Sequence, residues 1–143
     1  MVRGGERPKK DTLVNIEATG EFVVNIVSED FGEKMNLTSG EYPPDVDEFQ
    51  VSGLTPVPSD VVKAPRVKEA RVTMECKLHQ LVPVSDKLLG GTLVLGEVVR
   101  FHVQDDMINE ICEIDPDKLN TIGRMGGPVY TRTKDRYEMI RPA

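Results

Sequence analysis

The chain has few aromatic residues: Phe, Tyr and Trp make up 5% of its 143 residues, and Trp is absent. This disfavours proteins that bind single-stranded nucleic acid by stacking bases on aromatic side chains. The net charge of −6 at pH 7 also disfavours a nucleic-acid partner, because basic patches are needed to neutralise the phosphates. One phosphate in a local pocket remains compatible with this charge, since it needs only a cation and some backbone N–H groups.

Long apolar runs and paired cysteines are also missing. No run approaches the roughly 20 residues that a membrane span requires, and the stretch from Met1 to Lys10 lacks the apolar region of a secretory signal. Cys76 and Cys112 have neither a CxxC partner nor a histidine at metal-ligand spacing. We therefore expect a cytoplasmic protein with reduced thiols, no membrane partner and no metal site.

Known catalytic arrangements are not evident in the sequence. His79 and His102 show no ligand spacing, and each is interpreted as a packed or surface histidine. No nucleophile elbow is present. The chain has no group that would itself carry out redox chemistry, so a cofactor would have to supply it. We therefore expect no catalytic residue.

The apolar pattern predicts a mainly β fold, a β-barrel or related sheet with short peripheral helices, in a single domain over residues 1–143. Residues 1–10 are predicted to form a loop. Asp11 and Thr12 are candidate helix N-caps, and Gly20 is the expected end of that helix. The further expected elements are a strand at 21–28, a helix at 30–38, an ordered excursion at 39–65 with a helical turn at 45–49, a strand at 69–84, a strand at 92–103, a helix starting at 115–117 and a closing strand near 137–140.

The two longest strands are expected to form an antiparallel hairpin joined by residues 86–91. Residues 93–99 are apolar enough to predict burial on both faces of the second strand. The excursion at 39–65 carries spaced apolar residues among its prolines, so it is expected to be anchored to the core.

Three stretches are candidate binding sites. Lys10, Asp11 and Thr12 stand at an expected helix start, where unpaired N–H groups favour a phosphate; an ordinary helix cap is the commoner arrangement. Asn36 and Ser39 offer hydrogen-bonding groups to a ligand, or cap the end of a short helix. The third stretch is a glycine pair flanked by charged and aromatic residues, and it either approaches a ligand closely or forms a turn before a strand. It contains Arg124, Gly126, Gly127, Tyr130 and Arg132.

These motifs, taken in order, resemble the flavin reductase-like domain family of FMN-binding split barrels. The resemblance covers nearly the whole chain, and the ordered set is more specific than any one motif. It is carried by Lys10-Asp11-Thr12, Asn15-Ile16, Thr19-Gly20-Glu21-Phe22-Val23-Val24-Asn25, Met35-Asn36, Ser39, Tyr42-Pro43-Pro44, Asp47-Glu48-Phe49, Gly53-Leu54-Thr55, Pro65-Arg66-Val67, Glu75-Cys76, Leu95-Gly96-Glu97-Val98 and Gly126-Gly127-Pro128-Val129-Tyr130.

The resemblance implies a homodimeric oxidoreductase that binds FMN non-covalently and passes electrons from NADH or NADPH to or through the flavin. It places Lys10 and Thr12 in the phosphate pocket, with Asp11 holding the turn. It places Asn36 and Ser39 in or beside the pocket. It also places four residues on the rim where the flavin or nicotinamide approaches, namely Arg124, Gly126, Gly127 and Tyr130.

The beginning of the chain departs from the family pattern. Members normally have strands before the stretch that starts at Lys10, whereas Met1 stands shortly before it here. We expect the barrel to be incomplete at its N-terminus, because the start is assigned too late, because the chain is a remnant, or because a partner supplies the missing wall. The alternative function is therefore a non-catalytic interaction module that no longer binds FMN.

Overall fold

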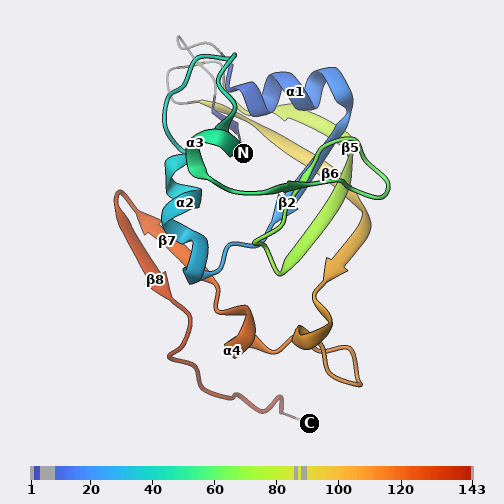
Figure 1. Cartoon of the computed structure of the whole chain (residues 1–143), viewed down its shortest axis with the longest axis vertical. Coiled ribbons are helices and arrows are strands. Elements are labelled where there is room, and N and C mark those ends of the chain that lie inside the picture. The colour runs from blue at the N-terminus through green and yellow to red at the C-terminus, as the bar shows by residue number, and fades with distance from the viewer. Residues whose placement is uncertain (1, 4–8, 86, 88–89, 143) are drawn as a thin grey trace.

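The structure is a computed structural model that describes residues 2–3, 9–85, 87 and 90–142. Antiparallel strands dominate it and short helices surround them, as predicted (Figure 1). The strands are β1 (Val2–Arg3), β2 (Glu21–Asn25), β3 (Pro56–Val57), β4 (Arg66–Val67), β5 (Val72–Pro83), β6 (Gly91–Val103), β7 (Ile122–Gly126) and β8 (Val129–Arg132). The helices are α1 (Asp11–Thr19), α2 (Gly32–Leu37), α3 (Glu48–Ser52) and α4 (Pro116–Leu119), with 3₁₀ turns η1 (Glu29–Phe31) and η2 (Asp105–Met107).

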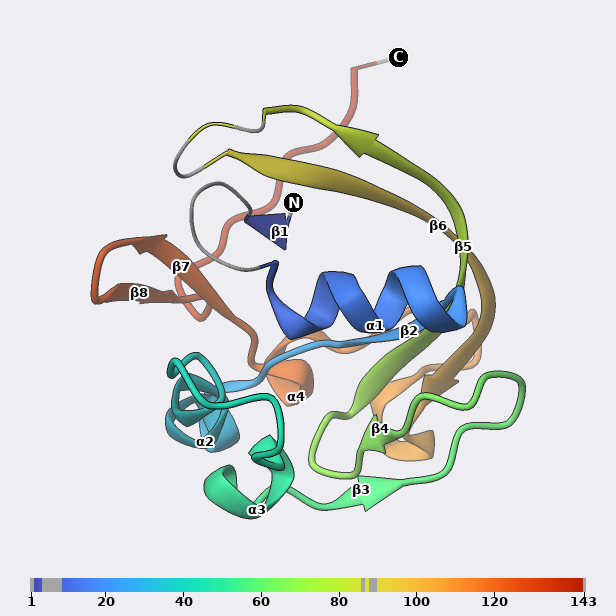
Figure 2. The same ribbon diagram turned by 90° about the horizontal axis from the view of Figure 1, so that it is seen from above.

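The main sheet has the strand order β1-β6-β5-β2, and every neighbouring pair is antiparallel. The predicted hairpin of the two longest strands, β5 and β6, is confirmed. Register shifts interrupt their ladder between Glu75 and Cys76 and between Leu78 and Gln80. Such irregularities bend strands, and the hairpin accordingly curves around α1 (Figure 2).

Helix α1 lies inside this curve and buries Leu13 and Ile16. It ends at Gly20, whose φ of 67° is the left-handed conformation expected of a helix-ending glycine. The predicted N-caps were wrong. Lys10 has the extended backbone of the cap residue, and its carbonyl accepts from the N–H groups of Leu13 and Val14, so Asp11 and Thr12 form the first turn.

The excursion between α2 and β5 is ordered and anchored, as predicted. Phe49 packs against a buried cluster that contains Leu54, Phe31 and Ala70. The helical turn is displaced from the predicted 45–49 to Glu48–Ser52, because the Asp47 carboxylate accepts from the Phe49 N–H at 2.9 Å and caps the helix there.

Two predictions about the strands β1 and β6 were wrong, and a third, about a closing strand, follows below. Val2 and Arg3, predicted as loop, pair with Thr92 and Gly91, which local sequence does not reveal; residues 1 and 4–8 lie outside the described part. Strand β6 is not buried on both faces, since Leu93, Leu95 and Val98 are exposed.

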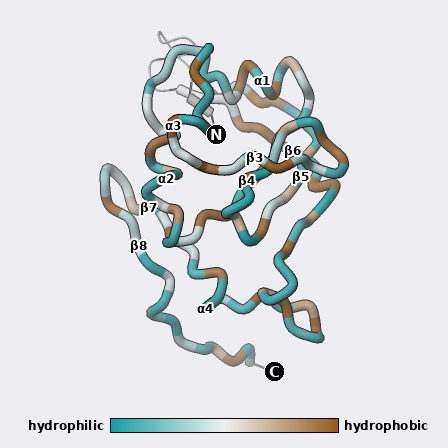
Figure 3. Tube along the Cα trace, viewed as in Figure 1, coloured by the Kyte–Doolittle hydropathy of each residue, from teal (hydrophilic) through white to brown (hydrophobic). Residues whose placement is uncertain are grey.

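The closing strand predicted near 137–140 is not formed, since residues 134–142 have no regular secondary structure. Without a pairing partner, the apolar side chains of Tyr137, Met139 and Ile140 are left exposed. Figure 3 shows a mostly hydrophilic segment after β8, with a short apolar stretch near the C-terminus. Among the described residues, no helix is long and apolar enough to cross a membrane.

Candidate functional site

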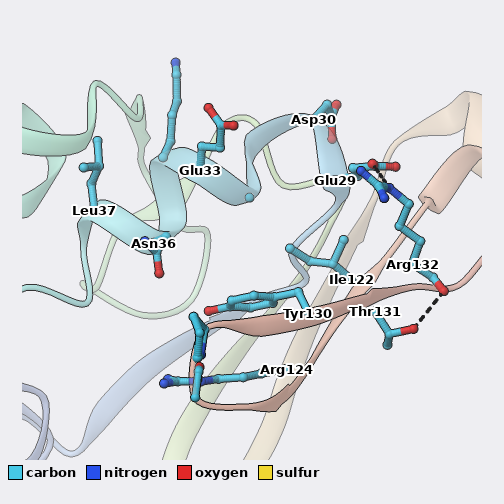
Figure 4. A pocket seen from close by; sticks show the side chains of 14 residues that line it. Glu29, Asp30, Glu33, Asn36, Leu37, Ile122, Arg124, Tyr130, Thr131 and Arg132 are labelled. Atoms are coloured by element: carbon cyan, nitrogen blue, oxygen red, sulfur yellow. Dashed lines mark hydrogen bonds and ion pairs between the residues drawn. The ribbon is translucent and has the colours of Figure 1, made fainter.

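A cleft of about 1240 Å³ lies between α2 and the β7–β8 hairpin. Figure 4 shows the side chain of Asn36 pointing from α2 toward the hairpin, on which Arg124 and Tyr130 lie. The cleft is lined by Glu29, Asp30, Gly32, Glu33, Lys34, Asn36, Leu37, Ile122, Arg124, Gly127, Pro128, Tyr130, Thr131 and Arg132.

The two walls of the cleft begin at one crossing of the chain. Ser28 forms a β-bridge with Thr121. Beside it, the Glu29 N–H donates to the Asn120 carbonyl at 3.0 Å, and the Ile122 N–H donates to the Val27 carbonyl at 3.3 Å. This crossing therefore joins two segments that are far apart in sequence. One continues into α2 and the other into the β7–β8 hairpin, which are the opposite walls of the cleft.

Gly32 allows the two walls to approach closely near this crossing. A Cβ at Gly32 would lie 2.7 Å from the Cδ1 atom of Ile122, which is too close for any side chain without a shift of Ile122. The close contact at this end leaves the open part of the cleft toward Asn36 and the tip of the hairpin.

The hairpin wall presents a free cation beside an aromatic ring. Arg124 and Tyr130 are directly opposite each other in the ladder, so their side chains share one face. The Nε–H of Arg124 donates to the Gly127 carbonyl at 3.3 Å, and Arg124 has no carboxylate partner among the described residues. Gly126 and Gly127 form the turn, with φ values of 113° and 52° that favour glycine.

Charges are neutralised at the other end of the cleft. Glu29 accepts from Arg132 and lies 3.9 Å from the Nζ atom of Lys134. The hydrogen bond from Arg132 holds the pKa of Glu29 below its usual range, although burial opposes this. Asp30 pairs with Arg71 at 3.1 Å. The uncompensated positive charge of the hairpin wall therefore belongs to Arg124.

The structure brings into the cleft four of the nine residues that the resemblance places in the site; Arg132 from the third candidate stretch also lines it, and Gly126 lies beside them in the hairpin turn. Those four are Asn36, Arg124, Gly127 and Tyr130. Ser39 instead donates from its hydroxyl to the Asn36 carbonyl at 2.7 Å. This contact agrees with the interpretation of Ser39 as a residue that caps the end of the short helix.

Lys10, Asp11 and Thr12 lie at the start of α1, apart from the lining of the cleft. Two of them act electrostatically on Glu48 at the start of α3. Burial and the charge of Asp11 raise the pKa of Glu48, and Lys10 opposes this shift. The α1 start is therefore a second polar region of mixed charge.

Sequence reasoning missed a buried carboxylate with a complete set of donors. Glu75 is fully buried. Its Oε1 atom accepts from the Asp60 N–H and lies 2.5 Å from Nε2 of His102, and its Oε2 atom accepts from the N–H groups of Val61 and Val62. Burial would raise the pKa of Glu75, but the Asp60 N–H, His102 and the two other N–H groups together lower it to about 2.

This arrangement fastens the loop between β3 and β4 to the sheet. The ligand atoms of Asp60, Glu75 and His102 lie within 4.8 Å of one another, as metal ligands do. Each oxygen of Glu75 already has two partners, however, so its lone pairs are used. The geometry supports a structural anchor. Alternation of the apolar residues Val72, Met74 and Cys76 would have placed Glu75 on the polar face of the strand, so only the fold reveals its burial and its partners.

Both cysteines are free thiols. Cys76 is buried in the sheet, and burial raises the pKa of its thiol. Cys112 is exposed in a loop at a φ of 62°. The free thiols agree with the expectation of reduced cysteines, and only Cys76 is packed in the interior.

The mainly β fold, with a long hairpin curved around one helix and a cleft at the side, is compatible with the split barrel that the resemblance implies. The family described as "Flavin reductase like domain" matches residues 1–123, and the chain belongs to this family. The resemblance inferred from the sequence motifs is thereby confirmed, and so is the split-barrel fold.

Individual relatives agree with this assignment. An uncharacterized protein of Aquifex aeolicus is 46% identical over 123 residues, which are 86% of this chain and 61% of the relative. The chain therefore spans less than two thirds of that relative's length. The structure of nitrilotriacetate monooxygenase component B from Bacillus cereus is similar, with a TM-score of 0.89, 34% identity, and coverage of 96% of this chain and 69% of that one.

A nitroreductase has a comparable structure. The 2-nitrobenzoate 2-nitroreductase NbaA of Pseudomonas fluorescens superposes with a TM-score of 0.84 and 32% identity, over 98% of this chain and 73% of that one. The chain therefore shares its fold with flavin reductase-like split-barrel proteins.

Proposed function

We propose that this chain binds FMN non-covalently and passes electrons from NADH or NADPH to or through the flavin. The observation that carries the proposal is the cleft of a flavin reductase-like fold with an uncompensated Arg124 beside Tyr130. The cleft is large enough for a cofactor, since ligand pockets measure about 300–1,000 Å³. Flavin, when bound, supplies the redox chemistry that side chains lack.

The residues at the start of α1 fit a phosphate group. The N–H groups of Asp11 and Thr12 belong to the first helical turn and have no acceptor within the helix. The side chain of Lys10 forms no ion pair among the described residues, so its charge is available to an anion. The helix dipole stabilises the carboxylate of Asp11 at this position, in keeping with a role in holding the turn.

The cleft residues fit the ring and nicotinamide parts of the site. The guanidinium of Arg124 offers donors to an anionic group, and the ring of Tyr130 offers an apolar face beside it. An added Cβ would meet nothing within 4 Å at either Gly126 or Gly127, so the turn leaves open space beside the rim. Asn36 offers amide groups from the opposite wall, and Ser39 holds the end of α2 behind it.

The chain's own residues are proposed to bind and orient the cofactors. No residue of the described cleft shows the nucleophile–base geometry of a catalytic set. We therefore assign no catalytic residue, and we assign to Arg124 and Tyr130 the work of positioning.

A homodimer is part of this proposal. Leu93 and Leu95 are exposed at alternate positions on one face of β6 and give a second copy an apolar surface. The same surface would also serve an interaction module that pairs with another chain but no longer holds FMN. This is the alternative function.

Titration of the full chain with FMN tests the proposal, with quenching of flavin fluorescence as the readout and circular dichroism as a check of folding. We expect saturable binding that Arg124→Ala weakens about tenfold, as expected for loss of a charge-assisted hydrogen bond. Arg141→Ala, which removes an arginine outside the cleft, is the control and should change nothing. A folded chain that does not bind FMN would contradict the proposal and favour the interaction module.

A further inference from the structure

A second cavity of about 380 Å³ lies between the β3–β4 hairpin and the C-terminal end of β6. Its described lining holds four basic side chains and no carboxylate, in a chain with a net charge of −6. It shares no lining residue with the cleft. The lining consists of Val57, Arg66, Val67, Lys68, Ala70, Arg71, Phe101, His102, Val103 and Gln104.

Two of the basic side chains carry charge that no acid compensates. Arg71 is paired with Asp30 and is therefore neutralised. Arg66 donates through Nε and Nη2 to the Pro58 carbonyl at 3.3 and 3.1 Å, which fixes its guanidinium without supplying a negative charge. The ammonium group of Lys68 has no hydrogen-bond or ion-pair partner among the described residues.

His102 adds a polar group whose ring is fixed by a hydrogen bond to a buried carboxylate. Its Nε2 atom lies 2.5 Å from the Glu75 carboxylate, and that carboxylate is anchored by the N–H groups of residues 60–62. An ionised carboxylate accepts only, so Nε2 is the protonated nitrogen. Nδ1 has no partner among the described residues and is left for a ligand.

An aromatic ring completes the cavity. Phe101 is 62% exposed although it lies on a strand, and Val57, Val67 and Val103 line the cavity with it. An exposed ring next to unpaired cations matches the two parts of a nucleotide, because bases stack on aromatic faces and phosphates bind Lys and Arg. The volume is near the lower end of the range for small-molecule sites.

We propose that this cavity is a binding site for a nucleoside monophosphate, with the phosphate held by Arg66 and Lys68 and the base against Phe101. The inference does not depend on FMN binding in the cleft.

Isothermal titration of the full chain with AMP, adenosine and inorganic phosphate tests the two halves of the site separately. We expect saturable AMP binding, with adenosine and phosphate each at least about tenfold weaker, because each lacks one set of contacts. Arg66→Ala and Lys68→Ala should each weaken AMP about tenfold. Lys63→Ala removes an exposed lysine outside the cavity and should have no effect.

Phe101 is tested by both Phe101→Ala and Phe101→Leu, so that a variant that fails to fold does not decide the matter. Both should weaken AMP and leave phosphate unchanged. Absence of saturable AMP binding, or AMP affinity that survives Lys68→Ala, overturns the inference. So does AMP binding no tighter than phosphate binding.

Flavin titration of the same variants separates this site from the cleft. Lys68→Ala should bind FMN as the unchanged chain does. If AMP displaces FMN and Lys68→Ala loses both, then FMN itself occupies this cavity, and the inference of a separate site is wrong.

Discussion

The carboxylate of Glu75 is stabilised by the backbone of a loop. Three consecutive N–H groups, from Asp60, Val61 and Val62, converge on it, an arrangement that proteins also use to bind external anions. Here the anion is built into the protein. The cost of burying a charge is offset because each oxygen has two partners.

Glu75→Gln is expected to lower the free energy of unfolding by about 2–4 kcal/mol, because a buried charge is lost and an amide N–H₂ is turned toward backbone donors. Glu97→Gln, at an exposed position on the neighbouring strand, is the control. Urea denaturation at neutral pH measures both. Equal stability of the two variants would show that the loop is not held through Glu75.

The same residue predicts the acid response. Its pKa is lowered from 4.5 to about 2 in the folded chain, so the folded state favours the ionised form. The stabilisation is fully present above the unfolded pKa, near 4.5, and is lost as the pH falls toward 2. We expect Glu75→Gln to lose less stability than the unchanged chain between pH 5 and pH 2. Parallel acid-denaturation curves would contradict this.

Lys10→Ala is expected to weaken FMN binding by about 1–3 kcal/mol, since it removes a charge at the start of α1. The adjacent Lys9→Ala is a close control, because Lys9 is paired with Glu17 at 2.8 Å and should contribute little to a phosphate. Fluorescence titration compares the two. An unchanged affinity in Lys10→Ala would rule out the phosphate assignment.

At the scale of the element, the predictions succeeded where a local signal determines structure. Gly20 ends α1 and Asp115 caps α4, because a left-handed glycine and an N-cap carboxylate act within one turn. The predictions failed where the structure of a segment depends on a partner that is distant in sequence. Strand β1 depends on Gly91 and Thr92, and the tail near Tyr137 has the composition of a strand but no neighbour with which to pair.

Strand β6 has a close contact at Gly96, where an added Cβ would lie 2.4 Å from the ring of Phe22. Gly96→Ala is expected to destabilise the chain by about 1–3 kcal/mol through overpacking. The double variant Gly96→Ala with Phe22→Leu should recover part of this loss, since the smaller side chain vacates the space. Thermal denaturation of the single and double variants measures the coupling; simple additivity would refute the contact.

At the scale of the whole molecule, the candidate site was only half visible in the sequence. The glycine pair and its flanking Arg124 and Tyr130 form one wall, as their spacing indicated. The other wall includes Glu29 and Glu33, which look like ordinary surface acids until the fold places α2 opposite the hairpin. The sequence pattern of one segment does not indicate which other segment lies on the opposite side of the cleft.

The proposed dimer predicts a mass of twice the 15.9-kDa chain by light scattering. Leu95→Glu should shift the equilibrium toward the monomer, because it places a charge within the apolar surface of β6. Ile111→Glu makes the same change at an exposed residue in a loop and should leave the mass unchanged. A monomer in all three proteins would exclude a dimer through this face.

The crossing of Ser28 and Thr121 has a mechanical consequence. Helix α2 and the β7–β8 hairpin both extend from it and form the two walls of the cleft, so a rotation at the crossing would change the distance between their far ends. A small rotation at the crossing moves Asn36 and Gly127 much farther than it moves Gly32 and Ile122, which are already in contact. We therefore expect the width of the mouth to change more easily than the width of the base. A ligand that bridges the tips would then have the greatest effect on the shape of the whole cleft.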